Sequence, residues 1–260
     1  MPAQKKPRVL LTRENNDALA SVLAEKGVAV LEIPLIKTVH EAQDEDVADV
    51  MREMGSYDWI TFSSANGVRG FFREFFKNFD DIRSLGIARI ACVGEATADE
   101  VRKFHLRPDV VPAVSTALAM ADAMADAMAE YETLDNLKVL CVQGSLSLPD
   151  LPKALDRKHR AIVDTAVVYK TEKLAVDGNS KDVADFKKHG ADAAVFASPS
   201  AVESFAANAE KLLLEDGAVR PKIFSIGPTT TEALKKYGMQ PYMEGGDIAG
   251  LLLAFLGING

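Results

Sequence analysis

A nineteen-residue pattern that occurs twice constrains the fold of this chain more than any other feature. The second copy, Ile223–Pro241, reads IFSIGPTTTEALKKYGMQP, and the first, Ile90–Pro108, reads IACVGEATADEVRKFHLRP. Gly94 of the first copy aligns with Gly227 of the second, and this spacing of 133 residues holds through the final proline of each copy. The repeat predicts a chain built from two copies of one structural plan.

Each copy has the pattern of a buried strand, a glycine turn and a helix. In the second copy an apolar run ends at Gly227, Thr229–Thr231 are suited to cap a helix, and Gly238 is suited to end it. A turn of this kind directs free backbone N–H groups and hydroxyls away from the carboxyl end of a strand, where an anion is favourably held. Two such turns predict a polyanionic ligand.

Strands alternate with helices along the whole chain. The expected strands lie at 8–12, 28–34, 57–62, 87–93, 109–111, 137–142, 161–169, 191–196 and 223–226. The expected helices include 15–27, one that begins within 40–49, 66–79, 96–104, 117–129, 152–158 and 248–258. Continuous apolar strands between helices predict parallel sheets covered on both faces. The predicted fold class is α/β, with two flavodoxin-like doubly wound parallel-sheet domains.

Ligands of such sheets bind at the carboxyl ends of the strands. With two such domains we expect the ligand in the cleft between them, with the glycine turns around one opening. The net charge of −8 argues against nonspecific binding to nucleic acid or to an anionic membrane, because both need a basic face. An anionic ligand must therefore be held by local donors.

Cysteine and histidine usage favours a reduced, metal-free protein. Cys92 and Cys141 lie in apolar strand-like runs without a C-x-x-C spacing, so we expect buried thiols. The histidines are scattered singly, and no metal site is expected. The apolar stretch 248–258 is too short to span a bilayer, and 1–7 has no secretory pattern. We expect a cytoplasmic monomer without membrane or nucleic-acid partners.

Six short motifs follow one another in a fixed order. They are L-L-T-R at 10–13, T-F-S-S at 61–64 with N-G-V at 66–68, V-G at 93–94 with A-T-A at 96–98, V-Y-K-T at 168–171, F at 196 with S-P-S-A-V at 198–202, and I-G-P-T-T at 226–230. Each motif is unspecific alone, whereas their order and spacing are specific. Through them the chain resembles the uroporphyrinogen-III synthase family over nearly its whole length.

The resemblance implies two domains between which the chain crosses over. One domain would comprise residues 1–38 plus 172–260, and the other residues 39–171. Lys37-Thr38 and Lys170-Thr171, which stand 133 residues apart, would lie in the two linker strands.

The resemblance also implies a reaction. Members of the family close hydroxymethylbilane, a linear tetrapyrrole with eight carboxylates, to uroporphyrinogen III in heme biosynthesis. Water is lost, the last ring, ring D, is inverted, and no cofactor is needed. An azafulvene forms first, its attack by ring D gives a spiro intermediate, and this reopens and recloses. The task implied for the protein, a lyase, is to hold one geometry more than to supply acid–base power.

The resemblance also implies a set of site residues. Tyr169 matches the tyrosine of the family and is either a hydrogen-bond or proton donor to the departing hydroxyl, or an aromatic residue at a strand end. Arg13 would be the basic anchor. Thr97 and Thr230 would serve both as cleft residues and as helix caps. The full set of expected substrate-binding residues is Thr12, Arg13, Ser63, Ser64, Thr97, Ser198, Ser200, Thr229 and Thr230.

Two positions depart from the pattern of the family. Gln143 stands before Gly144 where the family commonly has Arg-Gly, and Glu14 follows Arg13 where the family often has proline. A cationic contact with the substrate is therefore not expected at residue 143.

Three other classes of protein share parts of this pattern. A two-domain binding protein would close on an anion without chemistry, although such proteins are mostly exported. A dinucleotide-dependent enzyme is disfavoured because Gly94 and Gly227 stand alone, without a G-x-G-x-x-G spacing. A response-regulator receiver would need acidic residues at strand ends where Thr12 and Ser63 stand.

Overall fold

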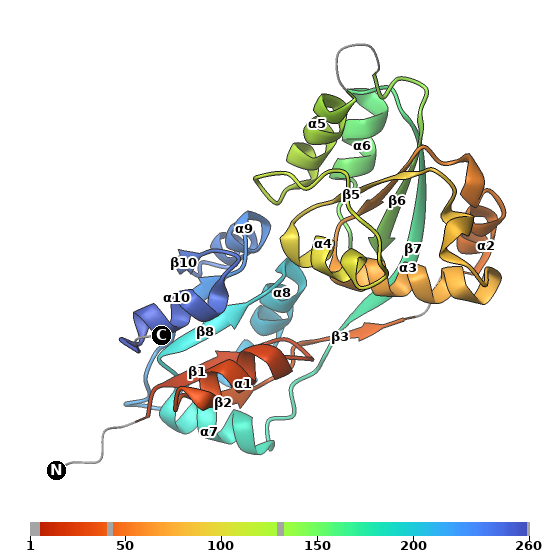
Figure 1. Cartoon of the computed structure of the whole chain (residues 1–260). Coiled ribbons are helices and arrows are strands. Elements are labelled where there is room, and N and C mark those ends of the chain that lie inside the picture. The colour runs from red at the N-terminus through yellow and green to blue at the C-terminus, as the bar shows by residue number, and fades with distance from the viewer. Residues whose placement is uncertain (1–5, 41–43, 129–132, 259–260) are drawn as a thin grey trace. The chain divides into compact units, whose positions relative to one another are not determined.

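A computed structural model describes residues 6–40, 44–128 and 133–258 (Figure 1). The chain divides into two compact units, each with its own sheet. The first unit is Met1–Lys37 with Glu172–Gly260, and the second unit is Thr38–Thr171. The chain therefore passes between the units twice, once after Lys37 and once after Thr171.

The sheet of the first unit has five strands in the order β10-β9-β8-β1-β2. All four pairings between neighbouring strands are parallel. In chain order the strands are β1 (Arg8–Leu11), β2 (Ala29–Glu32), β8 (Ala193–Phe196), β9 (Lys222–Ser225) and β10 (Pro241–Glu244). Numbered within the unit, their order is that of a flavodoxin-like sheet. The N-terminal strand β1 lies inside a sheet completed by the last third of the chain.

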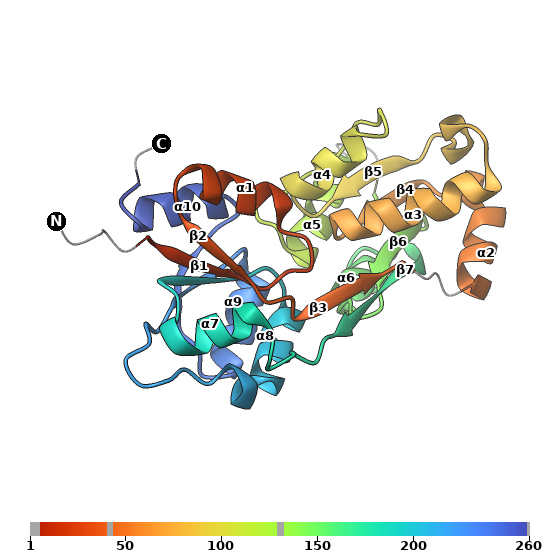
Figure 2. The same cartoon turned by 90° about the horizontal axis from the view of Figure 1, so that it is seen from below.

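Helices cover both faces of this sheet, as Figure 2 shows for α1 and α10 on one side and α7, α8 and α9 on the other. Leu10 packs in the cluster of α7, α8 and α9, whereas its neighbours Val9 and Leu11 pack with Leu23 and Leu252 of α1 and α10. Because successive side chains of a strand point to opposite faces, a sheet covered by helices on both faces needs strands that are apolar at every position. The helices are α1 (Asp17–Glu25), α7 (Lys181–His189), α8 (Pro199–Ala207), α9 (Pro228–Lys236) and α10 (Ile248–Phe255), with the 3₁₀ turn η3 (Ala209–Leu212).

The sheet of the second unit has the order β3-β7-β6-β4-β5. Its strands are β3 (Ile36–Val39), β4 (Trp59–Phe62), β5 (Arg89–Cys92), β6 (Lys138–Gly144) and β7 (Ile162–Lys173). The run β5-β4-β6-β7 corresponds to β9-β8-β1-β2 of the first unit, and Val110 forms a parallel bridge with Ala91 at the place of β10. The sequence repeat is thus a repeat of topology, to which the second unit adds β3.

Two apolar clusters also enclose the second sheet. Phe71, Phe72 and Phe75 of α3 are buried in one of them, and Met120 and Met124 of α5 are buried in the other. These aromatic and methionine side chains thus pack into the core, whereas Phe76 of α3 is 46% exposed. The helices are α2 (Asp44–Arg52), α3 (Ala65–Asn78), α4 (Glu95–Arg102), α5 (Ala117–Ala127) and α6 (Asp150–Arg157), with the 3₁₀ turns η1 (Met54–Ser56) and η2 (Ile82–Leu85).

The ends of two expected helices fall outside the described residues. Residue 129, the expected end of the helix that begins at Ala117, is not described. Residues 41–43, which precede α2, are not described either.

Cys92 and Cys141 are buried free thiols, as expected, and burial raises the pKa of each to about 12. Each helix within the described ranges is too short or too polar to cross a membrane.

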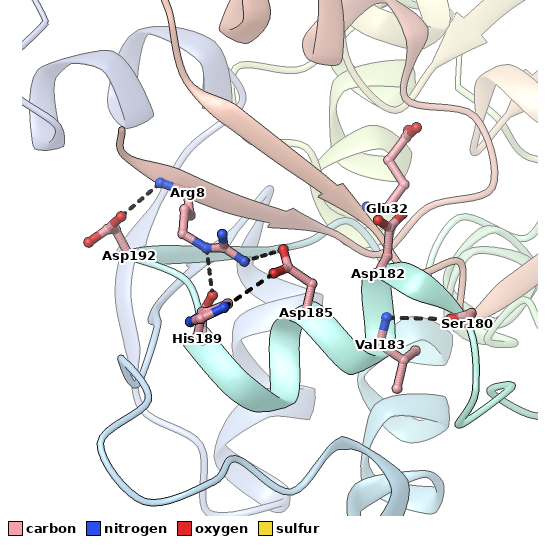
Figure 3. A network of polar contacts seen from close by, with 9 residues as sticks. Arg8, Glu32, Ser180, Asp182, Val183, Asp185, His189 and Asp192 are labelled. Carbon is pink, nitrogen blue, oxygen red and sulfur yellow. Dashed lines mark hydrogen bonds and ion pairs between the residues drawn. The ribbon is translucent and has the colours of Figure 1, made fainter. Parts of the chain in front are cut away.

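Arg8 joins the first strand to the last third of the chain (Figure 3). Its backbone N–H donates to Asp192 Oδ2 at 2.7 Å, Nε donates to the Gly190 carbonyl at 3.1 Å, and Nη2 donates to Asp185 Oδ2 at 2.5 Å. His189 Nε2 lies 3.8 Å from the other Asp185 oxygen. The Arg8 side chain is only 16% exposed. A largely buried guanidinium with two partners, together with the backbone N–H of Arg8, therefore fastens β1 into the sheet of the first unit.

We expect Arg8→Ala to lower the free energy of unfolding of the first unit by about 2–3 kcal/mol. The substitution leaves Asp185 and the Gly190 carbonyl without their guanidinium donors. Urea denaturation followed by circular dichroism measures the change. Arg83→Ala is the control, because Arg83 pairs with Asp81 in solvent, where ion pairs contribute little. Equal denaturation midpoints for the two variants would contradict the role given to Arg8.

Candidate functional site

The register of each sheet brings the sequence-predicted turns to one edge of that sheet. In the first unit, the parallel pairing of β1, β8 and β9 places Thr12, Ser198 and Gly227 after the carboxyl ends of neighbouring strands. In the second unit, the pairing of β4 with β5 does the same for Ser63 and Gly94. Within each unit, these turns therefore follow the carboxyl ends of neighbouring strands.

Two serines cap equivalent helices of the two units with the same geometry. Ser64 has φ −163° and ψ 156°, and its Oγ accepts a hydrogen bond from the Gly67 N–H at 3.0 Å. Ser198 has φ −161° and ψ 155°, and its Oγ accepts from the Ala201 N–H at 3.2 Å. The two serines differ in their second contact. Ser198 Oγ lies 3.0 Å from Ser200 Oγ, whereas Ser64 Oγ lies 3.0 Å from the Tyr169 hydroxyl. These side chains satisfy first-turn N–H groups of α3 and α8.

The two glycine corners begin helices without a side-chain cap in the described structure. Gly94 and Gly227 are the N-cap residues of α4 and α9, and both have an extended backbone. Each glycine carbonyl accepts the N–H groups of the third and fourth residues after it. Neither helix receives a side-chain cap hydrogen bond, although Ser115 Oγ lies against Gly94 and Glu244 accepts a hydrogen bond from Thr231 near the start of α9. The backbone N–H groups at the two corners are therefore not satisfied by a capping side chain and are suited to an anion.

The expectation that Thr97 and Thr230 cap these helices is wrong. Both stand inside the first helical turn, where they are only 4% and 2% exposed. Because the carbonyls of Gly94 and Gly227 accept the first helical hydrogen bonds, the glycines are the caps and the threonines turn toward the core. Thr229, by contrast, is exposed beside the corner.

Other expected site residues differ widely in exposure. Thr12 is fully buried, and its Oγ1 donates to the Val195 carbonyl at 2.7 Å. Ser63 Oγ donates to the Val142 carbonyl at 3.4 Å. Arg13 is exposed. The hydroxyls of Thr12 and Ser63 therefore join neighbouring strands, whereas the Arg13 side chain reaches solvent at the same strand end as Thr12.

Tyr169 contacts Ser64, which is 105 residues earlier in the chain. The Tyr169 hydroxyl lies 3.0 Å from Ser64 Oγ. The ring lies against Gly144, where an added Cβ would come within 2.3 Å of Cζ. Burial raises the pKa of Tyr169, while the hydrogen bond with Ser64 and the positive charge of Arg69 oppose that rise. The phenol is therefore protonated at neutral pH.

Arg69 is a cation of this region that sequence reasoning missed. From α3, its Nη1 donates to Glu100 Oε2 at 2.8 Å and its Nη2 donates to Asn66 Oδ1 at 2.5 Å. Asn66 Nδ2 in turn donates to Thr38 Oγ1 at 3.1 Å. The available signal was the spacing of three residues between Asn66 and Arg69, which places both on one helix face.

Sequence reasoning also missed Gly144. The signal there was a glycine at the end of a strand, which often marks a place where another group packs closely against the backbone.

Comparisons with known proteins agree with this fold. A family model described as uroporphyrinogen-III synthase HemD matches residues 17–246. The porphyrin biosynthesis protein HemD of Ruminiclostridium josui is 29% identical over 243 residues, which are 91% of this chain and 46% of that protein. This chain thus spans less than half the length of that relative. A putative uroporphyrinogen-III synthase of Methanocaldococcus jannaschii is 27% identical over 242 residues, 90% of this chain and 91% of that protein.

A solved structure shares the architecture. It is a mutant uroporphyrinogen III synthase of Thermus thermophilus, with a TM-score of 0.64 and 18% identity over 96% of this chain and 97% of that one. This likeness confirms the expected α/β fold class with parallel sheets. Since the family model matches most of its length, the chain belongs to the uroporphyrinogen-III synthase family.

Proposed function

We propose that this chain closes hydroxymethylbilane to uroporphyrinogen III, with inversion of ring D and loss of water, and without a cofactor. The observation that supports this most is the family match over residues 17–246. The local geometry agrees with it, because Tyr169 offers a protonated phenol and the glycine corners offer uncapped helix N-termini.

Tyr169 is the candidate proton donor of the first step. The phenol gives its proton to the terminal hydroxyl of the substrate, the carbon–oxygen bond breaks, and the electron pair leaves with the oxygen as water. The pyrrole left behind is an azafulvene cation. The phenolate recovers its proton at the end, when the unsubstituted carbon of ring D loses its hydrogen as ring closure restores the aromatic pyrrole. Attack by the substituted carbon of ring D gives the spiro intermediate, which reopens and recloses at the other carbon. This is lyase chemistry whose outcome depends on how the substrate is held.

Neutral donors are proposed to hold the carboxylates of the substrate. The protein carries a net charge of −8, so broad electrostatic attraction cannot collect a polyanion. Backbone N–H groups at Gly94 and Gly227, together with exposed Thr229, supply local positive potential without basic composition. Exposed Arg13 supplies a cationic contact. Ser63, Ser198 and Ser200 are the remaining proposed substrate-binding residues. Thr12, Thr97 and Thr230 are buried, so their proposed part is to hold these turns in place from within the core.

We expect Gly227→Ala to lower kcat/KM about tenfold while lowering the free energy of unfolding by no more than about 1 kcal/mol, the usual cost of a poorer N-cap residue. No atom lies within 4 Å of an added Cβ, and the extended backbone of Gly227 suits alanine. Only a carboxylate that approaches the corner would meet the methyl group. Gly55→Ala is the control, because its Cβ also meets open space but it lies before β4, at the opposite end of a strand. Unchanged kcat/KM in Gly227→Ala would exclude a close substrate contact there.

The decisive assay supplies hydroxymethylbilane, oxidises the product to porphyrin and separates the isomers by chromatography. The proposal predicts uroporphyrin III in excess, at a rate proportional to protein concentration. Formation of isomer I alone, at the rate seen without protein, would refute the proposed activity and favour a protein that binds an anion without chemistry.

A further inference from the structure

We infer that Ser64 is a positioning residue for Tyr169, and that the missing side chain of Gly144 leaves the space that the tyrosine ring occupies. The inference rests on the proposed function, since it concerns how the phenol is prepared for proton donation. It assigns Ser64 to the phenol rather than to a substrate carboxylate. It also gives the N-terminus of α3 a part in the reaction.

The contacts of Ser64 leave its hydroxyl able to donate a hydrogen bond to Tyr169. Its Oγ accepts a hydrogen bond from the Gly67 N–H at 3.0 Å and lies 3.0 Å from the Tyr169 hydroxyl. While the phenol is protonated, either oxygen of this pair can donate to the other. Once the phenol has lost its proton, only Ser64 can donate. Ser64 is therefore placed to stabilise the phenolate at the moment when it forms.

The surroundings of this pair favour negative charge on the tyrosine oxygen. Ser64 is the N-cap of α3, so the phenol is hydrogen-bonded to the positive end of a fourteen-residue helix. Arg69, one turn further along the helix, adds a positive charge that lowers the pKa of Tyr169. Glu100 and Asn66 hold the Arg69 guanidinium in place. Helix and arginine together oppose the effect of burial on the phenolate.

Gly144 restricts the position of the ring. An added Cβ at residue 144 would lie 2.3 Å from Cζ and 2.6 Å from the hydroxyl oxygen of Tyr169. The backbone on either side is held as well, because the Ser145 N–H donates to the Tyr169 carbonyl at 2.9 Å. Any side chain at residue 144 would move the ring away from Ser64.

The corresponding serine of the first unit shows that the cap itself does not need a tyrosine. Ser198 caps α8 with nearly the same φ and ψ as Ser64, yet its hydroxyl neighbour is Ser200. Capping therefore explains why a serine stands at both positions. It does not explain the contact with Tyr169, which belongs to the second unit alone among the residues described.

A double-mutant cycle tests the inference. Ser64→Ala is expected to lower kcat about tenfold with KM unchanged, as for a lost hydrogen bond to a charged group. In the Tyr169→Phe background, Ser64→Ala is expected to change kcat less than twofold, because Ser64 acts through the phenol. Ser64→Thr keeps the hydroxyl and should restore most of the activity. An equal loss in both backgrounds, or a raised KM with unchanged kcat, would overturn the inference.

Loss of a helix cap needs its own control, since Ser64→Ala also uncaps α3. Ser180 caps α7 in the first unit by accepting from the Val183 N–H at 3.3 Å (Figure 3). Ser180→Ala should lower the melting temperature to a similar extent while leaving kcat unchanged. If Ser180→Ala reduced kcat as much as Ser64→Ala does, cap loss alone would account for the effect and the inference would fail.

Gly144→Ala tests the same geometry while keeping both hydroxyls. The methyl group meets the far end of a flexible side chain, so the ring can swing away and the protein should still fold. We expect kcat close to that of Tyr169→Phe. Activity near the wild-type value would overturn the assignment of Gly144.

A measurement without turnover separates this inference from the proposed function. With ¹³Cζ-labelled tyrosine, the resonance of Tyr169 is identified among the five tyrosines by its absence in Tyr169→Phe. Ser64→Ala should shift this resonance and Ser64→Thr should not. An unmoved resonance overturns the inference whatever reaction the chain performs. A shifted resonance together with formation of isomer I alone would refute the function and retain the contact.

Discussion

Tyr169→Phe is expected to lower kcat about a hundredfold, the lower end of what a positioned proton donor contributes. The phenol is the candidate donor to the departing hydroxyl, and its raised pKa keeps it protonated at neutral pH. Phenylalanine retains the ring on Gly144 and removes only the oxygen. The free energy of unfolding should fall by no more than about 1 kcal/mol, since one hydrogen bond is lost.

Tyr57→Phe provides the matched control. Tyr57 is a buried tyrosine of the same unit, and its hydroxyl donates to Asp164 Oδ2 at 3.0 Å. It precedes β4 and so lies at the amino end of a strand, away from the turns. Steady-state kinetics on hydroxymethylbilane should show unchanged kcat in Tyr57→Phe. A Tyr169→Phe enzyme as fast as this control would leave Tyr169 as an aromatic residue at a strand end.

Gly190→Ala is expected to destabilise the first unit by about 3–5 kcal/mol, a large share of the stability of an ordinary domain. Gly190 has φ +67°, and an added Cβ would lie 1.9 Å from the Val219 carbonyl oxygen. The backbone at Val219 cannot move freely, because the Ala191 N–H donates to that same carbonyl. The Gly190 carbonyl also accepts from Arg8, so a shifted loop would disturb that contact as well.

Amide hydrogen exchange of β8 measures this loss within the first unit, with β4 of the second unit as an internal reference. Gly238→Ala is the control, because Gly238 has φ +70° but no atom within 4 Å of an added Cβ. The control isolates the cost of the left-handed backbone, about 1–2 kcal/mol. Equal protection of β8 in the two variants would show that the contact with Val219 carries no penalty.

The strands and glycine corners were predictable because their signals are local. An apolar run followed by glycine and a helical period gives a strand, a turn and a helix whatever the rest of the chain does, and here the repeat supplied the same signal twice. Which residue begins the helix is less local. At both corners a threonine competes with glycine for the cap, and the glycine carbonyl takes that role.

Contacts between distant segments were not predictable from local pattern. The expected strand at 161–169 is too short, because β7 continues to Lys173 and is the neighbour of β3 in the sheet. A strand partner far away in the chain overrides a polar composition. The contacts of Arg8 with Asp185 and of Ser64 with Tyr169 were not predictable either. Their partners lie 177 and 105 residues apart, and no local sequence pattern indicates such pairs.

The central claim is that the uncapped amides of the two glycine corners hold carboxylates of the substrate. It is tested most directly by ¹⁵N-amide NMR during titration with uroporphyrin III, which carries the same eight carboxylates as the product. Saturable downfield shifts are predicted for Glu95 and Ala96 at the start of α4 and for Thr229 at the start of α9. Binding that shifts other amides while those three stay unmoved would contradict the account.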